Sequence, residues 1–197
     1  MKTASRQAGG KFGSAVAGKL IFAVIVAGAV IVDLWSKARY FSHEDSVNFK
    51  PAVEIVKDFF FISSARNSGG VFGMFQEHTI VLAVLSLLAL VAAGVILFRV
   101  KGLRVWLHIA LGLIMGGAFG NLYDRLLLTT PDGGPARYVR DFLDVYIFGY
   151  HWPTFNAADA FICIGAAMVV LRVLFDGRKK NVDPGREKRR CGTADGK

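Results

Sequence analysis

Apolar residues along this chain gather into four long runs separated by polar connections. A helix needs about 20 mostly apolar residues to cross a bilayer. The runs that approach this length span residues 20–36, 79–98, 103–122 and 155–175. The pattern therefore predicts an all-α membrane protein with four transmembrane helices.

Two of the connections are long, residues 37–78 and 123–154. In the first, Phe59 to Ser63 has the composition of a strand, and Asn67-Ser68-Gly69-Gly70 that of a turn. We therefore expect a small β-containing loop region beside the helices. The aromatic cluster in this loop is suited to contact lipid or a lipidated ligand, or to anchor at the membrane surface; it comprises Phe59, Phe60, Phe61, Phe72 and Phe75.

Composition supports a membrane protein, since 53% of the 197 residues are hydrophobic. We interpret residues 1–178 as one membrane domain and residues 179–197 as a basic, disordered tail. A cleaved signal peptide is the alternative for the first run, because basic residues precede it and Ala27-Gly28-Ala29 offers a cleavage site. The helical pattern continues past Ala29, which favours a retained span.

The net charge of +9 does not indicate nucleic-acid binding, because the basic residues are grouped by topology. They lie before the first run, between the second and third, and after the fourth. With four spans these places share one side, which the positive-inside rule makes cytoplasmic. We expect both termini inside, the two long loops outside, and the tail attracted to anionic lipid.

Cysteine and histidine offer little chemistry in this sequence. Cys163 lies in the fourth run and Cys191 in the tail, so we expect no disulfide framework. No cluster has the spacing of metal ligands, and we expect no metal. His108 lies in an apolar run, where we interpret it as a packed, hydrogen-bonded side chain.

Costly polar groups nevertheless occur at one depth of the predicted bundle. Ionisable residues inside membrane helices usually mark a functional site. Here they close the first and third runs and open the fourth, all at the predicted outer end: Asp33, Lys37, Asn121, Asp124, Arg125, Asn156 and Asp159. This convergence predicts a site near the outer surface.

Helical spacing leaves two interpretations of these groups. Asp33 and Lys37 lie four residues apart, and Asp124 is adjacent to Arg125, so both could be structural ion pairs. Gly116, Gly117 and Gly120 would allow a neighbouring helix or a substrate backbone to approach closely.

Asp159 differs, because no basic residue lies within one helical turn of it. Asn156 could cap this helix, whose partial positive charge favours the carboxylate anion. A partner could come from residues 137–146, which we interpret as a segment dipping into the interface. If Asp141 from that segment meets Asp159, the two carboxyl groups would share one proton and supply both an acid and a base. Asn67 could donate hydrogen bonds to a substrate or stabilise its turn.

Five motifs in order make the chain resemble the lipoprotein signal peptidase (signal peptidase II) family of bacterial membrane aspartic peptidases. They are Asp33 with Lys37, NSGGVFGMF at 67–75, GGAFGNLYDR at 116–125, VRDF at 139–142 and FNAADAFICIG at 155–165. The linker TTPDGGPA before Val139 is longer than the family pattern.

The resemblance implies an endopeptidase that cleaves prolipoproteins before a diacylglyceryl-modified cysteine, with no cofactor. It assigns catalysis to Asp141 and Asp159, with Asp124 as the second choice. It assigns substrate positioning or support of the pair to Asn67, Asn121, Arg125 and Asn156. We expect a monomer in the bacterial cytoplasmic membrane.

The alternatives are a small four-span transporter and another class of intramembrane aspartyl protease. A transporter would need polar groups through the membrane, whereas the inner halves of the runs are almost wholly apolar. The other proteases carry a Gly-x-Gly-Asp motif, which this sequence lacks.

Overall fold

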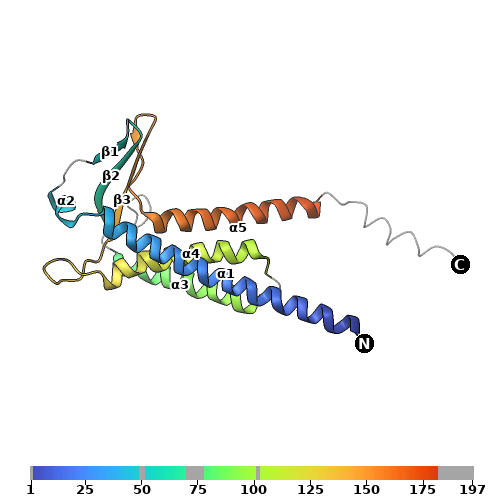
Figure 1. Ribbon diagram of the computed structural model, residues 1–197. Helices are drawn as coiled ribbons and strands as arrows, with labels where there is room; N and C mark the ends of the chain where they lie inside the picture. Colours follow the sequence, from blue (N-terminus) through green and yellow to red (C-terminus); the bar gives the residue numbers. More distant parts are fainter. Residues whose placement is uncertain (1, 49–51, 70–77, 101–102, 182–197) are drawn as a thin grey trace.

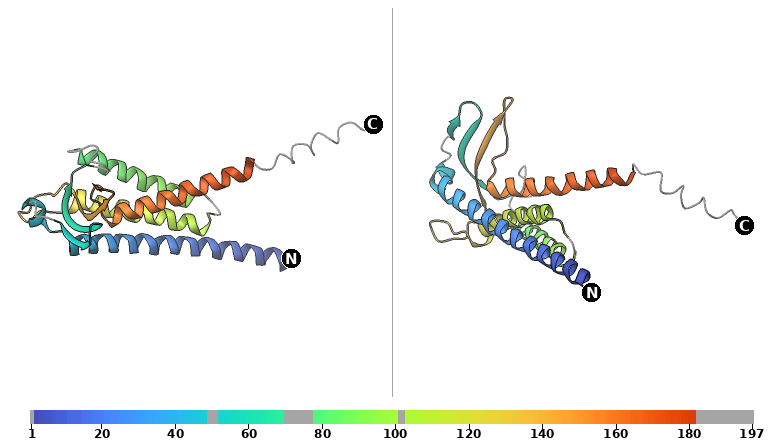
Figure 2. Two further views of the ribbon diagram at one scale, coloured as in Figure 1. Left: turned by 90° about the horizontal axis from the view of Figure 1, so that it is seen from above. Right: turned by 45° about the vertical axis from the view of Figure 1, so that its right-hand side comes forward.

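Four long helices dominate the computed structural model, which describes residues 2–48, 52–69, 78–100 and 103–181. They are α1 (Lys2–Tyr40), α3 (Thr79–Arg99), α4 (Val105–Leu127) and α5 (Ala157–Asn181), and they run side by side (Figures 1 and 2). Each contains a segment long and apolar enough to cross a membrane. Helix α4 is central, with α1, α3 and α5 packed against it. The predicted fold class is confirmed.

Two helices extend beyond the apolar runs that predicted them, because polar residues near their ends were read as loop or tail. Helix α4 continues to Leu127, through Asp124 and Arg125, which lie in what we expected to be a loop from residue 123. The helix continues because both side chains find partners in other elements, described below. Helix α5 runs on to Asn181; residues 182–197 of the expected tail lie outside the described residues.

A four-stranded antiparallel sheet stands at one end of the bundle (Figure 1). Its strands are β1 (Val53–Val56), β2 (Phe60–Asn67), β3 (Val139–Ile147) and β4 (Tyr150–His151), paired in that order, with the short helix α2 (His43–Asn48) beside it. Most of residues 137–146, which we expected to dip into the interface, belongs to strand β3, an element that the sequence did not predict. The register pairs Asn67 with Val139 and Ala65 with Asp141, so β2 supplies the backbone partners that β3 needs.

Glycines on α4 allow the close helix contacts predicted from the sequence. A Cβ atom on Gly120 would collide with the Asp33 carboxylate of α1, and one on Gly117 with the Ala158 carbonyl oxygen of α5. His108 is buried, and its Nδ1 lies 3.1 Å from the Arg104 carbonyl oxygen, which confirms its interpretation as a packed residue.

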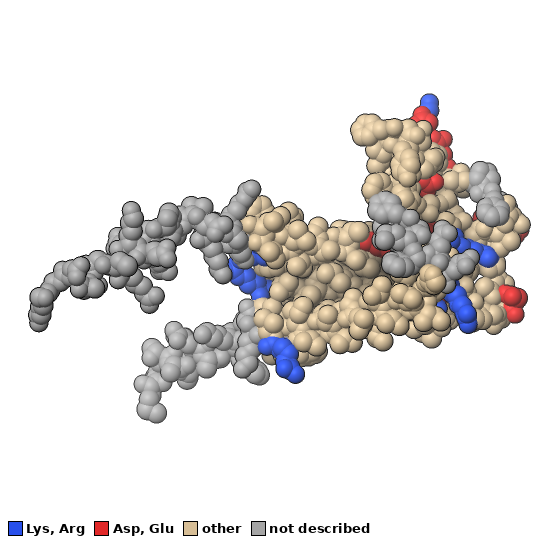
Figure 3. Space-filling view, turned by 180° about the vertical axis from the view of Figure 1, so that it is seen from behind, with Lys and Arg blue, Asp and Glu red and all other residues tan. Residues whose placement is uncertain are grey.

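Charged side chains lie at the two ends of the bundle on the face shown in Figure 3, and the band between them is free of charge. Lys19, Arg99 and Arg104 are exposed near the end opposite the sheet: Arg99 ends α3, Arg104 precedes α4, and Lys19 lies over the Phe98 ring. Exposed large hydrophobic residues cover the helices between these ends, including Val24, Leu88 and Val170. This surface fits a multi-pass membrane protein.

Candidate active site

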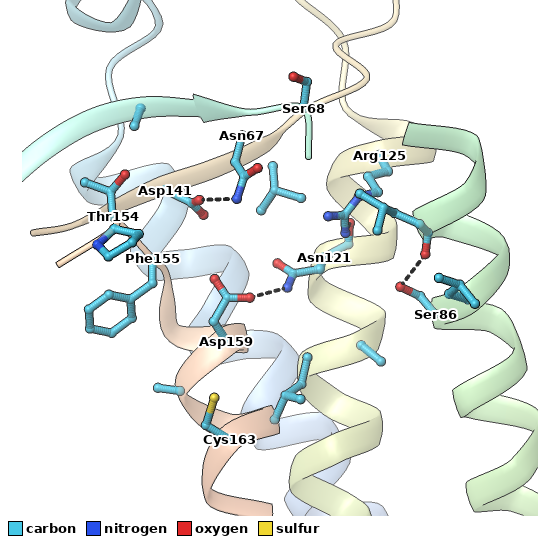
Figure 4. Close-up of a pocket in the computed structure, with 18 of the residues that line it drawn as sticks. Asn67, Ser68, Ser86, Asn121, Arg125, Asp141, Thr154, Phe155, Asp159 and Cys163 are labelled. Carbon is cyan, nitrogen blue, oxygen red and sulfur yellow. Dashed lines mark hydrogen bonds between the residues drawn. The ribbon is translucent and has the colours of Figure 1, made fainter. Parts of the chain in front are cut away.

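A cavity of about 760 Å³ lies where the bundle meets the sheet (Figure 4). Its walls come from α3, α4 and α5, the ends of β2 and β3, and the segment from Trp152 to Phe155. Its polar end is lined by five residues singled out from the sequence: Asn67, Asn121, Arg125, Asp141 and Asp159. Its other end is apolar, with Leu85, Ala89, Ile114 and Ile162.

Asp159 is fixed in the first turn of α5 by a reciprocal cap. The Asn156 side-chain oxygen accepts from the Asp159 backbone N–H at 3.0 Å, and Asp159 Oδ2 accepts from the Asn156 backbone N–H at 3.2 Å. This is a capping box, with asparagine and aspartate in place of the usual residues. Asp159 Oδ1 also accepts from Asn121 Nδ2 at 2.8 Å.

Asp141 lies on β3 with its side chain turned to the same cavity. Its two oxygens accept hydrogen bonds from Asn156 Nδ2 at 2.6 Å and from Asn67 Nδ2 at 2.9 Å. The residue is only 1% exposed. Burial, followed by the charge of Asp159, raises the pKa of Asp141 to about 7 despite the two amide donors.

Asn156 connects the two carboxyl groups. Asn156 is fully buried and caps α5: its backbone N–H donates to Asp159, and its side-chain oxygen accepts from the Asp159 N–H. Its side-chain nitrogen donates to Asp141. The cavity therefore presents two carboxyl groups held by one asparagine. The described residues place no lysine or arginine nitrogen within ion-pair distance of either group.

A second group of charges, which we call the support cluster, comprises Asp33, Lys37, Asp124 and Arg140. Lys37 Nζ lies 2.8 Å from Asp33 Oδ2 and 3.3 Å from Asp124 Oδ2, and all three side chains are fully buried. Arg140 Nη2 lies 2.8 Å from Asp124 Oδ1. The ion pair predicted between Asp33 and Lys37 is present.

The pairing suggested for Asp124 with Arg125 was wrong. Adjacent residues on a helix do not face each other, and Asp124 turns to Lys37 and Arg140 instead. Arg125 turns to the cavity side, where its Nη2 donates to the Gly69 carbonyl oxygen at 3.1 Å. Its buried Nε has no partner among the described residues.

Sequence reasoning missed two parts of this arrangement. Arg140 had no assigned role, although a basic residue between Val139 and Asp141 would face away from both on a strand. The wall from Trp152 to Phe155 was also missed. Its cue was Pro153, a turn-forming residue at the end of the second loop just before the fourth run.

A bundle of membrane helices with two carboxyl groups facing one cavity has the equipment of a membrane-embedded aspartic peptidase. Comparison with known proteins agrees, and the chain belongs to the signal peptidase II family. The family described as Signal peptidase (SPase) II matches residues 23–175.

Curated relatives include a lipoprotein signal peptidase of Geobacter sulfurreducens, 34% identical over 81% of this chain and 95% of the relative. A second lipoprotein signal peptidase, from Oleidesulfovibrio alaskensis, is 36% identical over 76% of this chain and 92% of the relative. A solved structure described as a bacterial membrane enzyme superposes with a TM-score of 0.67 at 27% identity, covering 81% of this chain and 90% of that one.

Proposed function

We propose that this chain is an aspartic endopeptidase that removes signal peptides from prolipoproteins, cleaving before the diacylglyceryl-modified cysteine, and that Asp141 and Asp159 are its catalytic pair. The observation that carries the proposal is the shared contact of both aspartates with Asn156 at one cavity. The family membership supports the substrate class.

The two carboxyl groups have different environments, and this suggests their roles. Asp159 lies in the first turn of α5 and accepts two hydrogen bonds from N–H groups, so its oxygens are already oriented as acceptors. Asp141 is buried and has a pKa raised to about 7, which favours retention of a proton. We assign Asp159 as the general base and Asp141 as the acid.

The reaction then follows from these positions. Asp159 takes a proton from a water molecule, whose oxygen attacks the carbonyl carbon of the scissile peptide bond. Asp141 donates its proton to the carbonyl oxygen, which gives a neutral tetrahedral intermediate. The proton held by Asp159 passes to the leaving nitrogen and the C–N bond breaks. Asp141 recovers its proton as the new carboxyl terminus forms.

The cavity suits a substrate that is itself a membrane helix. Its apolar end lies between α3 and α5, both of which pack on α4, so a signal-peptide helix can enter from the side. The unpartnered Nε of Arg125 and the amide of Asn67 lie at the polar end, where they can bind the backbone of an extended cleavage region.

The proposal also includes the orientation of the helix bundle in the membrane. The exposed basic residues Lys19, Arg99 and Arg104 lie at the end of the bundle away from the sheet, which favours a cytoplasmic location for that end and for both termini. The cavity then lies near the outer surface of the cytoplasmic membrane, in contact with lipid. We further propose that the enzyme acts as a monomer, that residues 1–178 form the peptidase unit, and that the tail is dispensable.

The test is a gel-shift cleavage assay on a diacylglyceryl prolipoprotein. Asp141→Asn and Asp159→Asn should each lower the cleavage rate by at least about 1,000-fold, because either change removes one half of the acid–base pair. Both proteins should still insert and fold, as judged by their thermal unfolding in detergent.

Asp144→Asn is the matched control, since Asp144 lies on the same strand and pairs with His151 at 2.9 Å, away from the cavity lining. We expect its rate to stay within a few-fold of the wild type. Full cleavage by a folded Asp141→Asn or Asp159→Asn protein would refute the assignment of the pair.

A further inference from the structure

The support cluster is electrically balanced only if Arg140 is counted. Asp33 and Asp124 are both fully buried, and buried Lys37 contacts both of them. One lysine cannot neutralise two carboxylates. The Arg140 side chain is 12% exposed and supplies the second positive charge through Asp124. Burial of an uncompensated carboxylate is strongly unfavourable, so the balance decides whether Asp124 keeps its arrangement.

The two carboxylates of the cluster each hold the backbone just before one catalytic aspartate. Asp33 Oδ1 accepts from the Ala158 N–H at 2.9 Å, and Ala158 precedes Asp159. Asp124 Oδ2 accepts from the Arg140 N–H at 3.0 Å, and Arg140 precedes Asp141. Lys37 lies between the two carboxylates and so links the start of α5 to β3.

The cluster also sets the orientation of a side chain at the cavity. Lys37 Nζ donates to Asn121 Oδ1 at 3.0 Å, so the amide nitrogen of Asn121 faces the other way and donates to Asp159. An amide can be turned by 180° at little cost unless a neighbour distinguishes its two ends. Lys37 makes that distinction here.

Arg140 itself takes no part in the cavity. Successive side chains on a strand point to opposite faces, and Asp141 lines the cavity whereas Arg140 lines a separate recess on the other side of β3. The Arg140 guanidinium reaches Asp124 with two nitrogens, Nε at 3.3 Å and Nη2 at 2.8 Å from Oδ1. These two hydrogen bonds fix the orientation of the Asp124 carboxylate in addition to balancing its charge.

We propose that Arg140 is a positioning residue for the catalytic pair. By neutralising Asp124 and fixing it from two directions, it holds the Asp141 strand in register and leaves Lys37 free to orient Asn121 toward Asp159. The inference rests on the proposed function, because it concerns the reaction of Asp141 and Asp159.

Loss of Arg140 would leave Asp33 and Asp124 to share Lys37. Asp124 would then move toward Lys37 or take up a proton, and either change weakens its bond to the Arg140 backbone. The catalytic carboxyl groups would be displaced without any loss of substrate contacts. Small misplacements of catalytic groups carry large rate penalties, so kcat should fall while KM stays unchanged.

The experiment compares Arg140→Gln with Arg137→Gln in the full-length enzyme, using the cleavage assay well below the unfolding temperature of each. Arg137 is exposed, precedes β3, and lines neither the cavity nor the recess. We expect Arg140→Gln to lower kcat at least tenfold with KM within twofold of the wild type. Arg137→Gln should keep both values within twofold, and Arg140→Lys should have a kcat between those of Arg140→Gln and the wild type.

A double-mutant cycle isolates the route through Asp124. On an Asp124→Asn background, Arg140→Gln should change kcat by less than twofold, because the partner of Arg140 is already lost. A full tenfold further loss on that background would overturn the inference. So would wild-type kcat in folded Arg140→Gln, or a rise in KM as large as the fall in kcat, which would indicate substrate contact.

Two further outcomes are decisive. If Arg140→Gln does not fold, Arg140→Lys tests the inference instead. Lysine keeps the positive charge but cannot make the two hydrogen bonds to Asp124 that the guanidinium makes. A severalfold lower kcat at unchanged KM supports the inference, and wild-type kcat overturns it. An inactive wild-type enzyme would refute the proposed function together with this inference, whereas an active wild type with equally active Arg140→Gln refutes this inference alone.

Discussion

Two groups of acidic side chains lie on opposite sides of Asn121 and β3, and they are held in different ways. In the support cluster, Asp33 and Asp124 are matched with Lys37 and Arg140. At the cavity, Asp141 and Asp159 are held by the amides of Asn67, Asn121 and Asn156 and by the backbone N–H of Asn156. Amides fix a carboxyl group in place without fixing its charge.

This difference separates the carboxylates of the support cluster from those at the cavity more clearly than burial does. Asp124 is 0% exposed and Asp141 is 1% exposed, so burial alone does not distinguish them. A carboxylate paired with two cations is held in its ionised form and is poorly suited to exchange protons. A carboxyl group held by neutral donors beside a second carboxyl group can take up or release one. The comparison favours Asp141 over Asp124 as the catalytic partner of Asp159.

Asp124→Asn has the largest expected effect on the difference between the two groups of carboxylates. Removing one member of a buried ionic cluster costs about 3–5 kcal/mol, because Lys37 and Arg140 lose a shared partner. We expect a large drop in unfolding temperature with a smaller loss of cleavage than in the Asp141→Asn enzyme, assayed in the cold. A stable Asp124→Asn protein with no activity, beside an active Asp141→Asn protein, would reverse the assignment.

The pH dependence of the unfolding free energy tests whether Asp141 holds a proton near neutral pH. The unfolded chain releases the Asp141 proton near the ordinary value of 3.8, whereas the folded protein keeps it until about 7. The folded state therefore binds more protons between these values, and its stability falls as pH rises through this window. The loss reaches about 4 kcal/mol above pH 7.

The stability measurement compares the wild type with Asp141→Asn by thermal unfolding in detergent from pH 4.5 to 8. Titrating groups that do not interact with Asp141 are common to both proteins, so their contributions cancel. We expect the stability of Asp141→Asn relative to the wild type to increase with pH. A difference that stays constant across this range would contradict a raised pKa at Asp141.

The smallest effect concerns how closely α1 approaches α4. Gly120→Ala should destabilise the enzyme by about 1–3 kcal/mol, since the added methyl group has no room beside Asp33. The matched control is Gly94→Ala on α3, where a Cβ would meet nothing within 4 Å. This change should leave the unfolding temperature equal or raise it, because alanine favours helix more than glycine does. Equal effects at the two sites would indicate that the close approach of α1 to α4 is not needed.

Sequence periodicity was sufficient to predict the four spans and the layer of polar residues, because bilayer thickness imposes a strong apolar pattern. Periodicity was not sufficient to predict which polar side chains contact each other. Asp124 and Arg140 come from a helix and a strand separated by a long loop, so only the folded sheet brings them together. β3 was missed because its charged residues, Arg140, Asp141 and Asp144, break the usual composition of a strand. The partners of Arg140 and Asp141 come from other elements of the fold, and no local spacing encodes them.

The order of the strands along the chain has a consequence for how the enzyme is made. Strand β2 pairs with β3, yet α3 and α4 lie between them in sequence. During synthesis, α3 and α4 are made after β2 and before β3. Strand β2 therefore has no partner strand until both helices have been made. Asp159 follows later still, on the last helix. A nascent chain therefore does not bring Asp141 and Asp159 together until its last helix has been made.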